Sequence, residues 1–298
     1  MKRVIFTLLA LSFAIATVSA QKTVDSPNKA DKVVRIWDNS TAPHSNEETK
    51  DENLDKHNFV GNTSQLALYI YKADKAKNTR RCIVILPGGG YSRVCITKEG
   101  YNLAEWLSSE GITAIVVKYR LPNYGHKEVP LEDAQAALRY AREHAKELDI
   151  DPAKVGIMGS SAGGHLAAYT STFTPDDQKP NFSVLFYPVI TGTTWQTHMG
   201  TFNRLLGNDR TPEMTKHYSL ENRVTATTPP TILLLSDDDR VVPPISSIRY
   251  YEALKHYGVK ATMYIFPSGG HGWAGDDGNF KYEKEYKHLL LDWLSTLK

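Results

Sequence analysis

The chain has 298 residues, of which 41% are hydrophobic and 23% are charged. This composition is typical of a globular protein and excludes wholesale disorder, collagen and a coiled coil. Its 35 Lys and Arg residues nearly balance its 33 Asp and Glu residues, for a net charge of +2. A nearly neutral chain does not favour nucleic acid or an anionic membrane as a partner.

Residues 1–20 have the pattern of a cleavable signal peptide. Lys2 and Arg3, which account for the excess of positive charge, precede an apolar run over residues 4–18, and Val18-Ser19-Ala20 offers small residues for cleavage. The run is shorter than the about 20 residues that span a bilayer. We therefore expect residues 1–20 to be removed and the mature protein to be periplasmic or extracellular, without a membrane anchor.

The two cysteines, Cys82 and Cys95, leave two interpretations open. Export to an oxidising compartment would permit a disulfide between them. The apolar run over residues 82–86 instead favours a buried, free thiol at Cys82. Neither cysteine has the suitably spaced partners of a metal site, and we expect no metal and no cofactor.

Residues 21–60 are polar, apart from a short apolar stretch at 33–37, and are expected to form an extended leader that wraps a single domain. Strands are then predicted at residues 66–71, 82–86, 112–119, 155–158, 184–187, 231–235 and 261–266. Helices are predicted at 101–107, 130–148, from the glycine-rich segment after residue 158 towards 169, at 247–256 and at 281–297. Residues 191–228 lack strong periodicity and are expected to form an excursion over the sheet.

The alternation of continuously apolar strands with amphipathic helices predicts a mostly parallel sheet covered by helices on both faces. The expected fold class is therefore α/β, with residues 21–298 forming one domain. The carboxyl ends of the parallel strands would meet at one edge of this sheet, and the motifs that carry chemistry all follow predicted strands.

The strongest motif is Gly159-x-Ser161-x-Gly163, which lies between a predicted strand and a predicted helix. This is the context of a nucleophile elbow, in which a tight turn exposes a serine hydroxyl and small residues avoid collision with neighbouring backbone. Ser161 is the candidate nucleophile. The alternative is a glycine-rich turn without chemistry.

A serine nucleophile needs a base and an acid that orients the base, here in the chain order Ser, Asp, His. His271, in Gly269-Gly270-His271-Gly272-Trp273 after the last predicted strand, is the candidate base. His165, four residues past Ser161, competes with it but is expected to pack in the helix.

The acid is expected after the strand at 231–235, where Asp237, Asp238 and Asp239 are consecutive. Asp239 is favoured because it immediately precedes the x-Val-Val-Pro turn into the next helix. Asp238 is the alternative.

The segment Pro87-Gly88-Gly89-Gly90-Tyr91 follows the first core strand. Hydrolysis through a tetrahedral oxyanion needs backbone N–H donors, which Ala162 and two of Gly88, Gly89 and Gly90 would supply. A phosphate-binding loop is excluded because neither glycine-rich phosphate pattern is complete. Tyr91 and Trp273 would flank this site as stacking platforms for a sugar, unless they pack in the core.

Over residues 81–297 the chain resembles the secreted bacterial acetylxylan and feruloyl esterases of the α/β-hydrolase fold, often grouped with prolyl-oligopeptidase-like hydrolases. In this resemblance, Ser161, Asp239 and His271 correspond to the nucleophile, acid and base, and residues 191–210 correspond to a loop over the site. The chain departs from the family where Leu235-Ser236-Asp237-Asp238-Asp239 replaces a His-x-x-Asp-like approach to the acid. The matching segments are Pro87-Gly88-Gly89-Gly90-Tyr91, Lys98-Glu99-Gly100-Tyr101, Trp106-Leu107, Tyr119-Arg120-Leu121-Pro122, Pro130-Leu131-x-Asp133, Gly159-Ser160-Ser161-Ala162-Gly163-Gly164-His165-Leu166, Tyr218-Ser219-x-Glu221, Pro229-Pro230 and Gly269-Gly270-His271-Gly272.

The ordered motifs predict a serine hydrolase, and the resemblance implies a carbohydrate esterase that removes acetyl or feruloyl groups from xylan or xylo-oligosaccharides. The expected partner is therefore an acylated poly- or oligosaccharide. An exopeptidase or a lipid or small-ester esterase would use the same three residues. A non-catalytic sugar-binding protein on a hydrolase scaffold is the alternative from another functional class.

Overall fold

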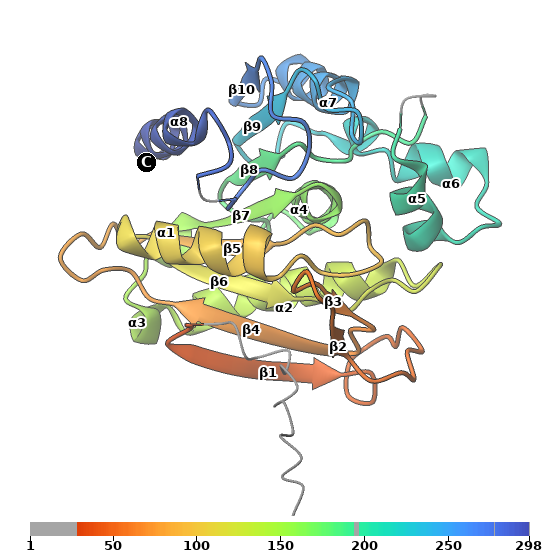
Figure 1. Cartoon of the computed structure of the whole chain (residues 1–298), viewed down its shortest axis with the longest axis horizontal. Coiled ribbons are helices and arrows are strands. Elements are labelled where there is room, and N and C mark those ends of the chain that lie inside the picture. The colour runs from red at the N-terminus through yellow and green to blue at the C-terminus, as the bar shows by residue number, and fades with distance from the viewer. Residues whose placement is uncertain (1–28, 194–196, 277, 298) are drawn as a thin grey trace, which may run out of the picture.

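The computed structural model describes residues 29–193, 197–276 and 278–297; the predicted signal peptide lies outside these residues. Eight strands form one sheet in the order β1-β4-β6-β5-β7-β8-β9-β10 (Figure 1). Their bounds are Lys32–Asp38 for β1, Gln65–Tyr71 for β4, Cys82–Leu86 for β5, Thr113–Lys118 for β6, Val155–Ser160 for β7, Ser183–Phe186 for β8, Thr231–Ser236 for β9 and Ala261–Phe266 for β10. The short strands β2 (Asn53–Leu54) and β3 (Val60–Gly61) form a separate hairpin.

All sheet neighbours from β6 to β10 pair in parallel, while β4 is antiparallel to both β1 and β6. The central strands are buried along their whole length because both faces of the sheet are covered, which requires the continuous apolar runs seen in β5 and β9. The predicted α/β class with a mostly parallel sheet is confirmed.

Two layers of helices cover the sheet. Helices α1 (Leu103–Ser109) and α8 (Glu283–Ser295) lie on one face, where Trp106 and Tyr286 meet edge to face with ring centroids 6.2 Å apart. Helices α2 (Glu128–Glu143), α4 (Ala162–Phe173) and α7 (Ile245–His256) cover the other face. The excursion after β8 contains α5 (Met199–Leu206), α6 (Pro212–His217) and a short 3-10 helix at Leu220–Arg223, on one side of the molecule (Figure 1).

Two helix predictions differ from the structure. The helix predicted at 130–148 divides into α2 and α3 (Ala145–Leu148) at His144, whose φ of −101° and ψ of 20° depart from helical values. The His144 ring stacks on Tyr140, and its Nδ1 donates to the Tyr140 carbonyl over 2.9 Å. The helix predicted at 101–107 is α1, preceded by a π-helical turn at Thr97–Asn102.

The polar leader is more integrated than predicted. Its apolar stretch forms β1, an edge strand of the main sheet with a bulge between Arg35 and Trp37, instead of only wrapping the domain. Further on, Val60 forms a bridge with Val94 beside the glycine loop that follows β5. The segment predicted as a wrapping leader therefore extends to the edge of the sheet where the motifs gather.

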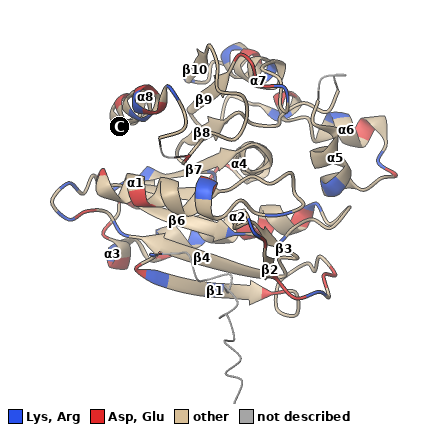
Figure 2. Ribbon diagram, in the orientation of Figure 1, with Lys and Arg blue, Asp and Glu red and all other residues tan. Residues whose placement is uncertain are grey.

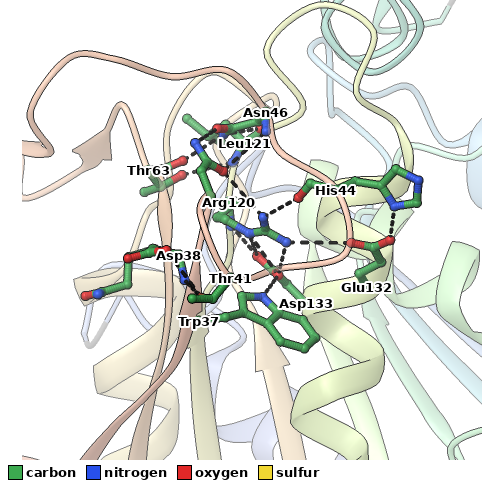
Figure 3. A network of polar contacts seen from close by, with 12 residues as sticks. Trp37, Asp38, Thr41, His44, Asn46, Thr63, Arg120, Leu121, Glu132 and Asp133 are labelled. Carbon is green, nitrogen blue, oxygen red and sulfur yellow. Dashed lines mark hydrogen bonds and ion pairs between the residues drawn. The ribbon is translucent and has the colours of Figure 1, made fainter.

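A buried ion pair fastens this segment to the body of the protein (Figure 3). Arg120 and Asp133 are fully buried, and Arg120 Nη2 donates to Oδ1 of Asp133 over 2.8 Å. From the leader, the Trp37 indole donates to the same carboxylate over 2.7 Å, and the His44 carbonyl accepts from Arg120 Nη1 over 2.6 Å. Arg120 and Asp133 each belong to a segment that matches the resembled family, and here they form a structural ion pair that also binds the leader.

Cys82 and Cys95 are both free and buried. Burial raises the pKa of the Cys82 thiol to about 12, so the thiol is protonated at neutral pH. In the part of the chain that the structure describes, no helix combines the length and apolar character needed to cross a membrane. Charged residues of both signs are mixed over the elements seen in Figure 2.

Candidate active site

The carboxyl ends of four parallel strands bring the sequence motifs together. The glycine loop follows β5, Ser161 follows β7, the three aspartates follow β9, and His271 follows β10. Because these strands are parallel and in register, with Leu86 opposite Gly159 and Ser236 opposite Phe266, their ends lie at the same edge of the sheet.

Ser161 occupies the sharp turn between β7 and α4, with φ of 54° and ψ of −118°. The glycines on either side of it are required by close backbone contacts. A β-carbon on Gly159 would lie 2.1 Å from the Gly163 carbonyl oxygen, and one on Gly163 would lie 2.0 Å from the Leu86 carbonyl oxygen. These approaches explain the Gly-x-Ser-x-Gly spacing and hold the hydroxyl above the sheet.

Ser161, His271 and Asp239 form one hydrogen-bonded chain. The Ser161 hydroxyl donates to His271 Nε2 over 2.8 Å, and His271 Nδ1 donates to Oδ2 of Asp239 over 2.7 Å. The other oxygen of Asp239 accepts from the N–H groups of Val241 and Val242, each over 2.9 Å. Asp239 is only 3% exposed, so these bonds fix the orientation of its carboxylate.

The structure distinguishes the three consecutive aspartates. Asp237 and Asp238 are exposed, whereas Asp239 contacts the histidine. Asp238 accepts from the N–H of Gly270 over 2.8 Å, a bond that lowers the pKa of its carboxyl group. It therefore supports the loop that carries His271, while Asp239 contacts the ring.

The competing histidine, His165, packs in the core as expected. It is fully buried in α4, its Nδ1 accepts from the Tyr91 hydroxyl over 3.1 Å, and its Nε2 donates to the Tyr218 carbonyl over 3.1 Å. Burial lowers the pKa of His165 to about 4, so the ring is neutral near pH 7.

The sequence left open which two of Gly88, Gly89 and Gly90 donate to the oxyanion, and the structure commits the N–H of Gly88 to another partner. The Gly88 N–H donates to Oε2 of Glu99 over 2.8 Å, so it is not free to bind an oxyanion. Gly89 and Gly90 line the cavity at Ser161, and the described residues offer no hydrogen-bond acceptor to their N–H groups. Ala162 is the first residue of α4, where an N–H has no acceptor within its helix.

Glu99 and Tyr187 are site residues to which the sequence patterns assigned no role. Tyr187 follows β8, its hydroxyl donates to Oε1 of Glu99 over 2.9 Å, and the hydroxyl in turn accepts from the Ala274 N–H over 2.9 Å. Burial raises the pKa of Glu99, although the positive charge of a protonated His271 opposes this shift. The available signals were the position of Tyr187 at a strand end and of Glu99 within a matching segment.

Tyr91 and Trp273 do not flank the open site, which corrects the prediction. Tyr91 is 1% exposed and bonds to His165. Trp273 is 3% exposed, stacks on Phe280 with ring centroids 4.0 Å apart and donates to the Ser236 hydroxyl over 2.9 Å. Each ring has an apolar neighbourhood and a satisfied polar atom, as packed core aromatics have.

Ser161 and His271 open on a cavity of about 430 Å³. The leader contributes Phe59 to its wall, and α5 and the residue before it contribute Arg204 and His198. The full lining is Phe59, Gly89, Gly90, Ser92, Arg93, Cys95, Lys98, Glu99, Ser161, His198, Arg204, Val241, His271 and Gly272. Across residues 29–193, 197–276 and 278–297, no three His, Cys, Asp or Glu side chains are grouped to hold a metal ion.

Comparison with known proteins places this site in a family. The family model BD-FAE matches residues 68–254, which carry Ser161, Asp239 and the glycine loop. The chain belongs to the BD-FAE family. His271 lies beyond the matched segment, and its pairing with Ser161 is given by the structure.

The similarity to individual proteins agrees with membership of the BD-FAE family. An acetylxylan esterase from Xylanibacter ruminicola is 41% identical over 73% of this chain and 46% of its own length. Endo-1,4-beta-xylanase B from Butyrivibrio fibrisolvens is 32% identical over 72% of this chain and 35% of its own length. The chain thus spans less than half the length of these curated relatives. The crystal structure of an acetyl ester-xyloside bifunctional hydrolase from Caldicellulosiruptor lactoaceticus matches with a TM-score of 0.74 and 33% identity, over 91% of this chain and 97% of that one. The fold is that of an α/β-hydrolase.

Proposed function

We propose that this BD-FAE protein is a serine esterase that removes acetyl groups from acylated xylan saccharides. The observation that carries the proposal is the hydrogen-bonded chain from Ser161 through His271 to Asp239 at the mouth of the cavity. The acetyl group and the xylose-based substrate are favoured by the similarity of the chain to an acetylxylan esterase and to an acetyl ester-xyloside bifunctional hydrolase.

In the first half of the reaction, Ser161 Oγ attacks the ester carbonyl carbon while His271 Nε2 takes the hydroxyl proton. The resulting oxyanion accepts hydrogen bonds from the N–H of Ala162 and from the Gly89–Gly90 segment. The carbon–oxygen bond to the sugar then breaks, and His271 returns the proton to the sugar oxygen. The products are the free sugar alcohol and an acetyl ester on Ser161.

In the second half, water takes the place of the sugar alcohol. His271 accepts a proton from the water as its oxygen attacks the acetyl carbon, and the same N–H groups bind the second oxyanion. Cleavage of the bond to Ser161 Oγ, with return of the proton, releases acetic acid and restores the serine. Asp239 holds the imidazole in the required tautomer throughout, with Nδ1 protonated.

Release of acetate from acetylated xylo-oligosaccharides tests this proposal, with release of ferulate from feruloylated arabinoxylan fragments measured in parallel. We expect acetate release by the wild-type protein and at least about 10³-fold less by Ser161→Ala. Hydrolysis of small aryl esters without release of acetate from the oligosaccharides would refute the saccharide substrate but not the esterase. Preferred release of ferulate would reassign the acyl group.

We also propose that the protein is exported after cleavage near Ala20, on the strength of the positive, apolar and small-residue regions of residues 1–20. An exported esterase would meet polysaccharide outside the cytoplasm. Mass spectrometry of the mature protein from the producing cell tests this, and an intact N-terminus in a cytoplasmic fraction would contradict it.

A further inference from the structure

The charges that line the active-site cavity are unequal. Among its described lining residues, Arg93, Lys98 and Arg204 are basic, and Glu99 is the one acid. Both oxygens of Glu99 are already occupied, by the Gly88 N–H and by the Tyr187 hydroxyl. The cavity therefore presents cationic side chains next to an acid whose two oxygens each already accept a hydrogen bond from the protein.

Two of the three cations have acidic partners in the protein. Lys98 Nζ lies 2.7 Å from Asp276 Oδ2. Arg93 lies 3.6 Å from Asp55 Oδ2, and its guanidinium covers the Phe59 ring, 4.7 Å from the centroid. These pairs restrain the two side chains and offset their charges.

Arg204 differs from them. It is the one charged residue of α5, and within the part of the chain that the structure describes no ion pair joins it to a carboxylate. Among the described residues, Arg204 makes one hydrogen bond, from Nη1 to the Gly200 carbonyl over 3.2 Å, within its own helix. Most of the guanidinium donors of this half-buried side chain are therefore available to a ligand.

Arg204 also lies beside the predicted oxyanion loop. A β-carbon built on Gly90 would lie 3.9 Å from Arg204 Nη1 and 3.6 Å from His198 Cε1. Gly90 in turn lines the same cavity as Ser161 and His271. A substrate whose ester is at Ser161 can therefore place an anionic group at Arg204 within the same cavity.

We infer that Arg204 forms a carboxylate-binding subsite, so that the preferred substrates are esters that carry a free carboxylate. This inference rests on the proposed esterase function and specifies its substrate class. A guanidinium matches a carboxylate with two parallel N–H···O bonds, and charge-assisted pairs of this kind are stronger than neutral hydrogen bonds. The carboxylate could come from an acidic sugar near the acetylated residue or from a dicarboxylic acyl group.

The test compares substrates that differ only in whether that carboxylate is free or methyl-esterified. The first pair is an acetylated xylo-oligosaccharide with a uronic acid side group and its uronate methyl ester, with acetate release measured. The second pair is a naphthyl hemisuccinate and its methyl ester, with naphthol release measured after subtraction of spontaneous hydrolysis. At low ionic strength, we expect a free carboxylate to raise kcat/KM about tenfold in one of the pairs.

Variants show whether this preference belongs to Arg204. Arg204→Gln should abolish the preference, and Arg204→Lys should retain part of it because the charge remains but the bidentate geometry is lost. Lys216→Gln also removes one positive charge, but from an exposed position on α6 outside the cavity, and should leave the preference intact. Thermal unfolding of each variant separates a folding defect from a binding defect.

An active wild-type protein without a preference in either pair, or a preference that survives in Arg204→Gln, would overturn the subsite. Failure of the wild-type protein to hydrolyse any of the four esters would instead overturn the proposed function. The pair that responds identifies the source of the carboxylate, on the sugar or on the acyl group.

Discussion

The Gly88 N–H donates a hydrogen bond to the buried Glu99 carboxylate, whose other oxygen accepts from the Tyr187 hydroxyl. Tyr187 also accepts from Ala274, three residues after His271. One carboxylate therefore links the glycine loop after β5 to the loop that carries the proposed base. Glu99 is a positioning residue in this arrangement, because it acts on the site through Gly88 and Tyr187.

Glu99→Gln should lower kcat by about tenfold or more. An amide has one oxygen and one NH₂ group, so either the Gly88 N–H or the Tyr187 hydroxyl would face a donor in a buried place. KM should change less than kcat, because the glycine loop binds the developing oxyanion and not the ground-state ester. Steady-state kinetics on an acetyl ester, with the melting temperature as a control for folding, measure this. A variant with the kcat of the wild-type protein would contradict the role.

Asp239→Asn and Asp238→Asn form a matched pair of substitutions on adjacent residues. Asp239→Asn should lower kcat by about 10³-fold or more, because the imidazole loses the acceptor that sets its tautomer. Asp238→Asn should lower it by no more than about threefold, since the amide oxygen still accepts from Gly270. The opposite ranking of the two variants would assign the acid to Asp238.

His165 should make stability depend on pH. Its folded pKa of about 4 lies below the unfolded value of about 6.5, so between these values the unfolded chain binds the extra proton. Stability is therefore expected to fall as the pH decreases from about 6.5 to about 4, by about 3 kcal/mol from this residue. Denaturant unfolding of the wild-type protein and of His165→Gln at several pH values isolates the contribution, and equal pH slopes in the two proteins would exclude it.

The Arg120–Asp133 pair should act as a structural anchor. Arg120→Met would leave a buried carboxylate without its cation, for an expected loss of about 3–5 kcal/mol of unfolding free energy. Arg120→Met combined with Asp133→Leu should cost less than the sum of the two single substitutions, because neither charge is then left alone. Additive losses in denaturant unfolding would show that the two groups do not depend on each other.

The sequence predicted the parts of this protein where one physical effect dominates. The runs at 82–86 and 231–235 are strands because their apolar residues suit a buried sheet, and the spacing of Gly159, Ser161 and Gly163 follows from backbone contact distances. The structure joins Ser161, His271 and Asp239 as that order predicted.

The parts that the sequence did not predict depend on tertiary contacts. Lys32–Asp38 is a half-buried edge strand in a polar segment, so its pattern is weak until β4 pairs with it. The roles of Tyr91 and Trp273 depend on the direction of each side chain, and both point into packed aromatic surroundings. A buried carboxylate such as Glu99 has the same sequence signature as a solvated one, and only its partners distinguish it.

Covalent labelling shows directly whether His271 activates Ser161 as a nucleophile. A fluorophosphonate reacts with a serine that a neighbouring histidine activates, and mass spectrometry of the digested protein locates the adduct. We expect one adduct on Ser161 in the wild-type protein, much slower labelling in His271→Ala, and no labelling at this position in Ser161→Ala. Absence of an adduct on Ser161 in the folded wild-type protein, or an adduct formed at the same rate without His271, would contradict it.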